Sequence, residues 1–464
     1  MGDDMTVSAG PTREIRKFNI SKSEIGVIAV LFLVAVMVAQ PNLNIIITFL
    51  IAPLMLWLFF YDEFYLLLPV FMLFTTQLLL KENMPLARFY IYLLLIKLVF
   101  TKKSSKLNAV MLPALVVFFL YCGFTIMGSN LDYQNAAGTL GDAPGWISNL
   151  RLATRTMLDL VIVYLMAYLL IHDKKICQRF FVVLVVAVLL SGLYGYRAQN
   201  VMEYSLGMDA NTGTMLSIVR HKGSLEDPNY FGFYVNIAIV IVLSAKVLQK
   251  PYLRYPLLVA LYYFLLASGS LTSLACNVAV LFFYIVLKYK KAAPIALVIL
   301  GTLTLGAYLT ATNLPVIKDM TVIQNVQLRI ERQIYHTEDN EVISTSGRTD
   351  LWEYYTNFYK KQDTLPRLFG GNIMMSSVIE PKFLEEPGHA SHMVYIQFLL
   401  NFGLLGTLVL LLCFIAKACG YAYRYFKENE PIFMTFFLCS CIWLIYGASL
   451  DYFPNWIFML FYFL

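Results

Sequence analysis

The sequence predicts an all-α integral membrane protein with about 12–14 transmembrane helices and a large extracytoplasmic loop. Hydrophobic residues make up 59% of the chain and charged residues 14%, which is far more apolar than a soluble domain requires. Apolar runs recur along the chain and are separated by short basic clusters. The net charge of +6 therefore reflects membrane-flanking loops, and we expect no nucleic-acid partner.

The apolar runs define the expected helices. Several are shorter than the roughly 20 residues of a spanning helix, so flanking residues must complete them. The first run is followed by Gln40-Pro41 and not by a small-residue cleavage site, so it reads as a retained helix and not a signal peptide. In chain order the runs are 25–39, 45–60, 64–80, 89–99, 109–126, 157–171, 180–193, 231–245, 256–267, 271–287, 292–310, 394–415, 432–446 and 452–464.

Basic residues predict the orientation. With a cytoplasmic N-terminus, the positive clusters all fall in inside loops, as the positive-inside rule requires for an even number of helices. Those loops are 101–107, 172–179, 246–254, 288–291 and 417–427. The resulting organisation is a cytoplasmic segment 1–23, transmembrane helices over 24–312 with outer loops 129–151 and 197–229, a large outer loop 313–391, and C-terminal transmembrane helices over 392–464.

The long outer loop carries amphipathic stretches at 323–334 and 349–360, which favour an ordered, functional segment over an idle turn. The seven cysteines lie in apolar runs or basic loops and not in the long polar loops. A disulfide framework or a cysteine metal site is therefore not expected.

Four motifs fall in or beside the predicted outer loops. They are Arg220-His-Lys222-Gly-Ser-Leu-Glu-Asp-Pro-Asn229 before a helix, Ser268-Gly269-Ser270 between two helices, Gly347-Arg348-x-x-x-Trp352 opening an amphipathic helix, and His392-x-x-Tyr395-x-Gln397 followed by Gly403-x-x-Gly406. Their order and spacing resemble the O-antigen polymerase and ligase superfamily of membrane glycosyltransferases over roughly residues 200 to 410. The first 200 residues resemble that family only in hydropathy, and the Ser-Gly-Ser turn lacks an arginine that family members often carry there.

The resemblance implies a GT-C-like helical architecture in the bacterial inner (plasma) membrane, with a periplasmic active site. It implies transfer of a sugar chain from an undecaprenyl-diphosphate-linked glycan donor to the hydroxyl of a lipid-linked glycan or lipid A-core acceptor. Membrane lipid and a chain-length regulator are the other partners that it implies. Lipid-diphosphate release leaves negative charge to be stabilised, and the outer loops contain no Asp-x-Asp pair to hold a metal. No metal or cofactor is therefore expected.

Arginine is the natural substitute for the metal, because its permanent charge and forked donors match phosphate oxygens. Arg220 and Arg348 match the family's functional arginines, and Lys222 is a possible assistant. The competing interpretations are ion pairs of Arg348 with Asp350 or Glu353 and of Arg220 with Glu226 or Asp227, and a solvated role for Lys222.

His392 is the predicted group that positions or deprotonates the acceptor hydroxyl, since a pKa near 6.5 suits a base at neutral pH. His389, three residues earlier, is the alternative. Further candidate substrate-binding residues are Tyr395, Gln397, Trp352 and Asn229. A membrane-interface role for the tyrosine and a helix cap around Asn229 are the structural alternatives.

Within this class the sequence favours a polymerase that joins lipid-linked repeat units into O-antigen, capsular or exopolysaccharide. The alternative is an O-antigen ligase that moves glycan to lipid A-core or protein. A lipid-linked oligosaccharide flippase or transporter is the second alternative, and it predicts internal repeats and charges deep in the helices. The sequence shows no repeat, and only Lys97 and Lys246 approach such a position.

Overall fold

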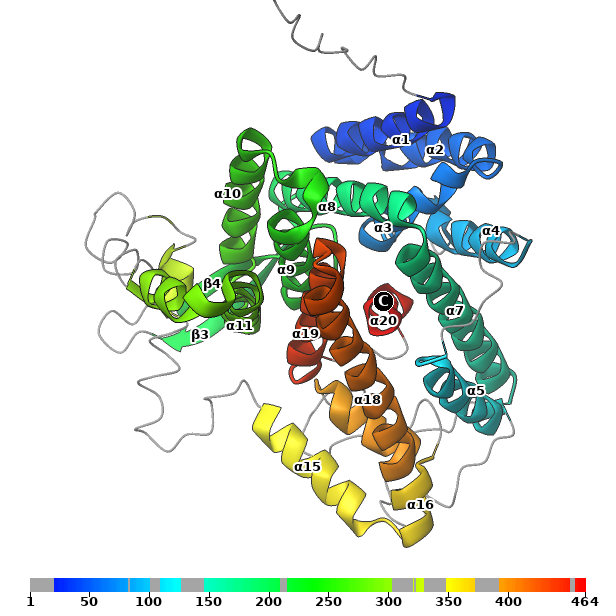
Figure 1. The fold of residues 1–464 in the computed structure, drawn as a ribbon. Coiled ribbons are helices and arrows are strands. Elements are labelled where there is room, and N and C mark those ends of the chain that lie inside the picture. The colour runs from blue at the N-terminus through cyan, green and yellow to red at the C-terminus, as the bar shows by residue number, and fades with distance from the viewer. Residues whose placement is uncertain are drawn as a thin grey trace, which may run out of the picture.

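The computed structural model describes residues 21–81, 84–100, 109–126, 146–208, 215–302, 320, 323–328, 348–371, 392–450 and 455–464. Helices dominate this part of the chain (Figure 1). The helices of the membrane region are α1 (Lys22–Ala39), α2 (Asn44–Leu58), α3 (Leu68–Leu73), α4 (Leu86–Phe100), α5 (Leu112–Ile126), α7 (Trp146–His172), α8 (Lys174–Arg197), α9 (Pro228–Ser244), α10 (Pro251–Ala267), α11 (Leu271–Tyr289), α18 (Val394–Glu428), α19 (Pro431–Gly447) and α20 (Trp456–Phe463). The predicted outer loop 313–391 contains α15 (Arg348–Lys361) and α16 (Thr364–Phe369).

The chain is a helical membrane protein. Six helical stretches of the described chain are long and apolar enough to cross a bilayer, and four apolar helices are shorter. The six stretches are Lys22–Ala39, Pro41–Leu58, Leu150–His172, Lys174–Arg197, Leu271–Thr302 and Val394–Glu428. Many large apolar side chains on these helices are exposed, as lipid-facing surfaces require. The predicted total of 12–14 crossings stays a prediction.

The predicted membrane helix at 64–80 is wrong. This run forms a 3-10 helix, Asp62–Leu67, then the six-residue α3, and then strand β1 (Leu79–Lys81), which pairs with β2 (Met84–Pro85). Its residues from Phe64 to Phe74 are almost completely buried, so its hydrophobicity serves the protein core and not a lipid-facing surface. A short apolar run does not by itself distinguish these two cases.

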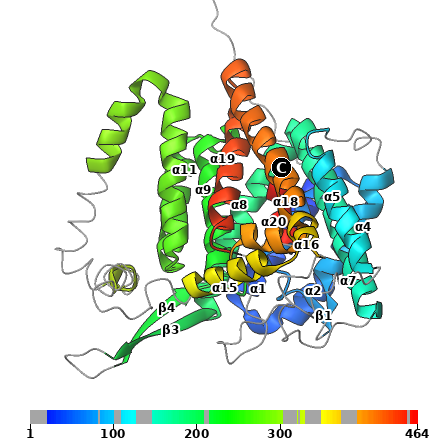
Figure 2. The same ribbon diagram turned by 90° about the horizontal axis from the view of Figure 1, so that it is seen from below.

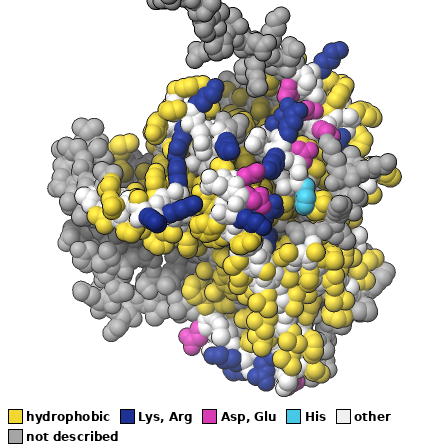
Figure 3. Space-filling view, viewed as in Figure 1, with side chains coloured by type: hydrophobic (Ala, Val, Ile, Leu, Met, Phe, Trp, Pro, Cys, Tyr) yellow, Lys and Arg dark blue, Asp and Glu magenta, His cyan; other side chains and the backbone are white. Residues whose placement is uncertain are grey.

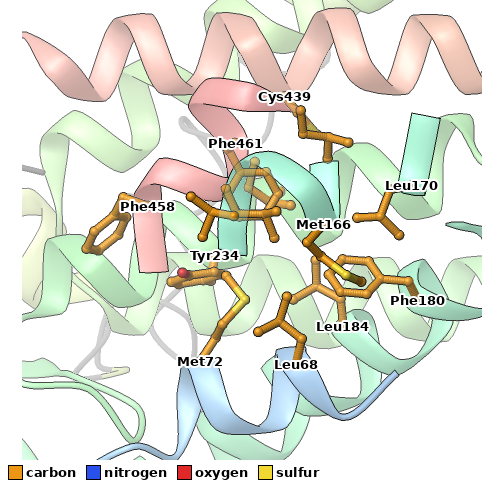
Figure 4. Packing of buried hydrophobic residues seen from close by; sticks show 14 of the residues in the cluster. Leu68, Met72, Met166, Leu170, Phe180, Leu184, Tyr234, Cys439, Phe458 and Phe461 are labelled. Atoms are coloured by element: carbon orange, nitrogen blue, oxygen red, sulfur yellow. The ribbon is translucent and has the colours of Figure 1, made fainter. Parts of the chain in front are cut away.

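Figure 4 shows how α3 enters the core: Leu68 and Met72 face Met166 of α7, Leu184 of α8 and Tyr234 of α9. The short α20 lies in the middle of the bundle (Figure 1), and its residues 458–464 are buried. Packing of α3 and α20 between longer helices explains why both are so apolar although neither is long enough to span a membrane.

The all-α prediction is incomplete, because predicted loop 197–229 contains an antiparallel hairpin. Strand β3 (Val201–Met208) pairs with β4 (Met215–His221), with Val201 opposite His221. The hairpin projects from one end of the helical bundle (Figure 2). Asn325 from the predicted long outer loop donates its side-chain amide to the Val219 carbonyl at 2.9 Å, so two predicted outer loops meet.

Segments predicted to be cytoplasmic also meet one another. Arg179 forms ion pairs with Glu24 at 2.7 Å and with Glu63 at 3.0 Å, and Lys174 pairs with Glu430 at 2.7 Å. Figure 3 shows charged side chains gathered over the upper half of this face and mostly hydrophobic side chains over the lower half. The predicted inside loop 172–179 therefore contacts three other segments that the predicted topology puts on the same side of the membrane. The orientation itself stays a prediction.

Helix α18 is kinked at Gly403, whose φ is 65°, and continues to Glu428. The apolar run predicted at 394–415 is therefore longer than expected, and Lys417 belongs to the helix and not to a loop. Lys417 is 4% exposed and donates to the carbonyls of Phe461 and Tyr462 in α20, at 3.2 and 2.6 Å. A basic residue counted as a loop charge thus holds two helices together.

Candidate functional site

Arg220, at the end of strand β4, is only 5% exposed and links three parts of the chain. Its Nε donates to the carbonyl of Ser268 at 3.1 Å, and its Nη2 donates to Oδ1 of Asn229 at 2.9 Å. Gly269 has a φ of 55°, and a Cβ atom placed on it would lie 3.1 Å from Arg220 Cγ. The Ser-Gly-Ser turn and the Arg220 motif, which are far apart in sequence, are thus one structural unit.

Asn229 lies at the start of α9 and completes this unit. Its backbone N–H donates to the Asp227 carboxylate at 2.6 Å, so Asp227 is the helix cap. Its side-chain oxygen also accepts from the Ser270 hydroxyl at 2.7 Å, in addition to Arg220. Lys222, which follows β4, is half-buried, and its backbone N–H donates to the carbonyl of Asn200 at 3.1 Å.

A buried polar network continues from this unit along α9 and α11. Asn236, two turns beyond Asn229, donates to the Ser273 carbonyl and the Tyr446 hydroxyl, both at 3.0 Å, and accepts from Asn277 at 2.9 Å. These bonds join α9, α11 and α19 inside the apolar bundle. Unsatisfied polar groups are costly there, so the network fixes how the three helices pack.

The motif around His392 is placed beside α15. Helix α15 packs its apolar face, including Leu351 and Tyr355, against Ile396 and Leu400 of α18, and Trp352 lies at the border of this cluster. The predicted amphipathic helix at 349–360 is therefore confirmed, with Arg348 as its first residue. The side chain of Arg348 and the whole of His389 lie outside the described residues.

His392 itself precedes α18 with a φ of 51°, and its side chain is half-buried. Tyr395 donates its hydroxyl to the Leu444 carbonyl of α19 at 2.5 Å, and Gln397 is buried. A Cβ atom on Gly447 would lie 2.7 Å from Val394 Cγ1, so the end of α19 touches the start of α18. Because Tyr446 in the same turn contacts Asn236, the end of α19 lies between the His392 motif and the polar network.

Sequence reasoning missed a cavity of about 460 Å³, whose described wall includes none of the candidate site residues named from the sequence. Its wall includes Ser224, Leu225 and Glu226 from the loop that follows β4, and Phe458 at the start of α20. It also includes Arg88 of α4 and, from α7, Arg155 and Asp159. Arg88 donates through one nitrogen to both carboxylate oxygens of Asp159, at 2.9 and 2.8 Å. The loop that Arg220 anchors therefore forms one side of an arginine-containing chamber.

The chamber has two further charged side chains, Arg155 and Glu226. Within the described part of the chain, neither Arg155 nor Glu226 lies within ion-pair distance of an opposite charge. The sequence contains a signal for this site: Arg151 and Arg155 are four residues apart, which places them on one helix face. The predicted helix begins only at residue 157, so both arginines precede it, whereas α7 begins at Trp146 and includes them.

His221 lies next to Arg220 in the sequence but belongs to the packing of the hairpin. Its ring stacks on Tyr196 with centroids 5.8 Å apart, and burial lowers the pKa of this histidine below its usual range. A neutral, stacked histidine is a structural element of the hairpin base.

The described residues contain no cluster of three or more histidine, cysteine, aspartate or glutamate side chains that could hold a metal ion. A search of protein-family models finds none that matches this chain, and a search of curated proteins finds no match either.

Proposed function

We propose that this protein is a membrane glycosyltransferase that uses a lipid-diphosphate-linked glycan as donor. The observation that carries the proposal is the chamber lined by Arg88 and Arg155 at the end of the bundle that holds the hairpin. Arg88 is paired with Asp159, whereas Arg155 has no ion pair among the described residues. The guanidinium of Arg155 is well suited to the oxygens of a departing diphosphate, because it keeps its charge at every physiological pH. On the predicted topology this chamber opens on the outer face of a bacterial inner membrane, with the N-terminus in the cytoplasm.

In the proposed reaction the acceptor hydroxyl oxygen bonds to the anomeric carbon of the donor glycan as the bond from that carbon to the diphosphate breaks. The lipid diphosphate leaves with the bonding electrons, and Arg155 stabilises its charge. Arg220 is assigned a positioning role, because its donors already hold Ser268 and Asn229. Arg348 stays a proposed second phosphate ligand from α15.

The acceptor's proton needs a base, and two residues compete for this role. His392 is the base that the family resemblance implies, whereas Glu226 is a carboxylate in the wall of the chamber without an ion pair among the described residues. The test measures the rate of glycan transfer by the His392→Ala and Glu226→Gln variants, and donor binding to each variant is measured separately. Loss of transfer with donor binding kept identifies the base, because the base acts on the acceptor and not on the leaving group.

We favour a polymerase of lipid-linked repeat units, with lipid-linked glycan as both donor and acceptor and a chain-length regulator as partner. A ligase to lipid A-core is the alternative. The experiment is incubation of purified protein with a lipid-linked repeat unit in the presence of EDTA. A product ladder supports the polymerase, and transfer only after addition of lipid A-core supports the ligase.

A matched pair of variants links the assay to the chamber. Arg155→Gln should lower transfer at least ~10-fold, on the order of 1.4 kcal/mol of transition-state stabilisation. Arg367→Gln removes the same charge from the exposed α16 and should leave transfer unchanged. Equal activity of both variants, a strict requirement for a divalent metal, or translocation of the lipid without glycan transfer would each contradict the proposal.

A further inference from the structure

A second cavity, of about 660 Å³, lies between α4 and α7 and shares Arg88 and Arg155 with the first. Its wall adds Arg151 and the side chains of Tyr92 and Leu158. The two helices run side by side at the edge of the bundle (Figures 1 and 2). One pair of arginines therefore faces both an inner chamber and an outer one.

The charges of the outer cavity all have the same sign. Its wall contains three arginines and no aspartate or glutamate, whereas Asp159 and Glu226 both belong to the inner chamber. In the described part of the chain, Arg151 lies beyond ion-pair distance of any carboxylate, as Arg155 does. Asp159 of the inner chamber pairs with Arg88 and also attracts Arg155, so one carboxylate faces three arginines that repel one another. A bound anion of high charge density would stabilise this excess of positive charge.

An apolar stripe leads away from the outer cavity along α4. Tyr92, Ile96 and Val99 are 46%, 46% and 61% exposed and are spaced four and three residues apart, which places them on one helix face. From Arg88 to Val99 the helix extends about 16 Å, at ~1.5 Å per residue. The cavity thus joins a cationic pocket at one end of α4 to an exposed apolar surface along the length of this helix.

We propose that this cavity is where an isoprenoid diphosphate enters from the bilayer, with its phosphates on Arg151 and Arg155 and its chain along the exposed face of α4. The inference rests on the proposed function for the identity of the lipid and adds the place and direction of its binding. The sugar end would then continue past Arg88 into the inner chamber, which puts the bond to be broken at the arginines common to both cavities.

The test uses benzoylphenylalanine as a photo-crosslinking residue in protein reconstituted into nanodiscs of phosphatidylglycerol with undecaprenyl diphosphate. Ile96→benzoylphenylalanine probes the stripe on α4, and Val259→benzoylphenylalanine, at a 71% exposed position of α10, is the matched control. We expect at least ~10-fold more undecaprenyl adduct at residue 96 than at residue 259. The double variant Arg151→Gln/Arg155→Gln should reduce that adduct to the control level, and Arg367→Gln should not.

Equal adduct at the two positions, or an adduct that survives loss of both arginines, would overturn the inference. So would phosphatidylglycerol adducts that undecaprenyl diphosphate does not displace, because the pocket would then bind ordinary anionic lipid. Glycan transfer is assayed on the same preparations to separate the two proposals. Transfer without a selective adduct refutes the entry site alone, whereas a selective adduct without transfer supports the entry site and refutes the glycosyltransferase.

Discussion

Arg220→Lys separates a positioning role from a phosphate-binding role. The guanidinium makes two hydrogen bonds to buried acceptors, the Ser268 carbonyl at 3.1 Å and the Asn229 amide oxygen at 2.9 Å. Lysine keeps the charge but lacks the fork, so at most one of these bonds should survive. A buried hydrogen bond from a charged donor contributes about 1.5–3 kcal/mol, so the free energy of unfolding should fall by about 2 kcal/mol.

The measurement is the denaturant midpoint of purified protein in detergent, followed by size-exclusion chromatography with fluorescence detection. Arg155→Lys is the matched control, because Arg155 faces the chamber and has no ion pair in the described chain. It should unfold as the wild type does. A wild-type midpoint for Arg220→Lys together with lost transfer would refute our reading, since Arg220 would then act on substrate and not on the fold.

Two other predictions concern the packing that surrounds the site. Gly403→Ala should lower the free energy of unfolding by about 2–4 kcal/mol, because the φ of 65° disfavours any side chain and the new Cβ would overlap the Gly370 backbone. Gly420→Ala is the control, since a Cβ at this position of the same helix meets no neighbour. Equal melting temperatures of the two variants would contradict this prediction. Asn236→Leu should cost about 2–3 kcal/mol, since it breaks bonds to Ser273, Tyr446 and Asn277, whereas Ser440→Ala, which removes a bond within one helix, should cost less than 1 kcal/mol. Chemical denaturation of the Asn236→Leu and Ser440→Ala variants in the same detergent measures the two losses of unfolding free energy.

The parts of the fold that sequence predicts are those encoded by local periodicity. The amphipathic pattern at 349–360 predicts α15, whereas the sidedness that the basic clusters predict stays a prediction. The internal α3 was misjudged because burial in protein and burial in lipid select the same residues. The polar composition of 197–229 predicts a loop, whereas Val201–Met208 and Met215–His221 pair as a hairpin.

The sequence predicts less of the candidate site than of the fold. The sequence predicts a functional role for Arg220, but its partners lie 9 and 48 residues away and belong to different elements, so no local pattern predicts that its donors are occupied. Gly403-x-x-Gly406 belongs to the predicted outward motif, yet the kink at Gly403 and its contact with Gly370 give this glycine a packing role. Arg88 and Arg155 reach the same chamber from two helices that only the tertiary fold brings together.

The arginines of the two cavities lead to a further prediction. Their mutual repulsion destabilises the folded protein, and a bound anion should offset it. If inorganic diphosphate occupies the site, it should stabilise the folded protein by RT ln(1 + [L]/Kd), about 2.7 kcal/mol at a concentration 100 times Kd. Thermal unfolding of the wild type should therefore shift upward with diphosphate and much less with sodium chloride of equal ionic strength. The double variant Arg151→Gln/Arg155→Gln should lose most of the shift with diphosphate, because it lacks two of the three arginines of the outer cavity. An equal shift in the double variant would place the anion elsewhere on the protein and remove the electrostatic basis for the chamber as a diphosphate site.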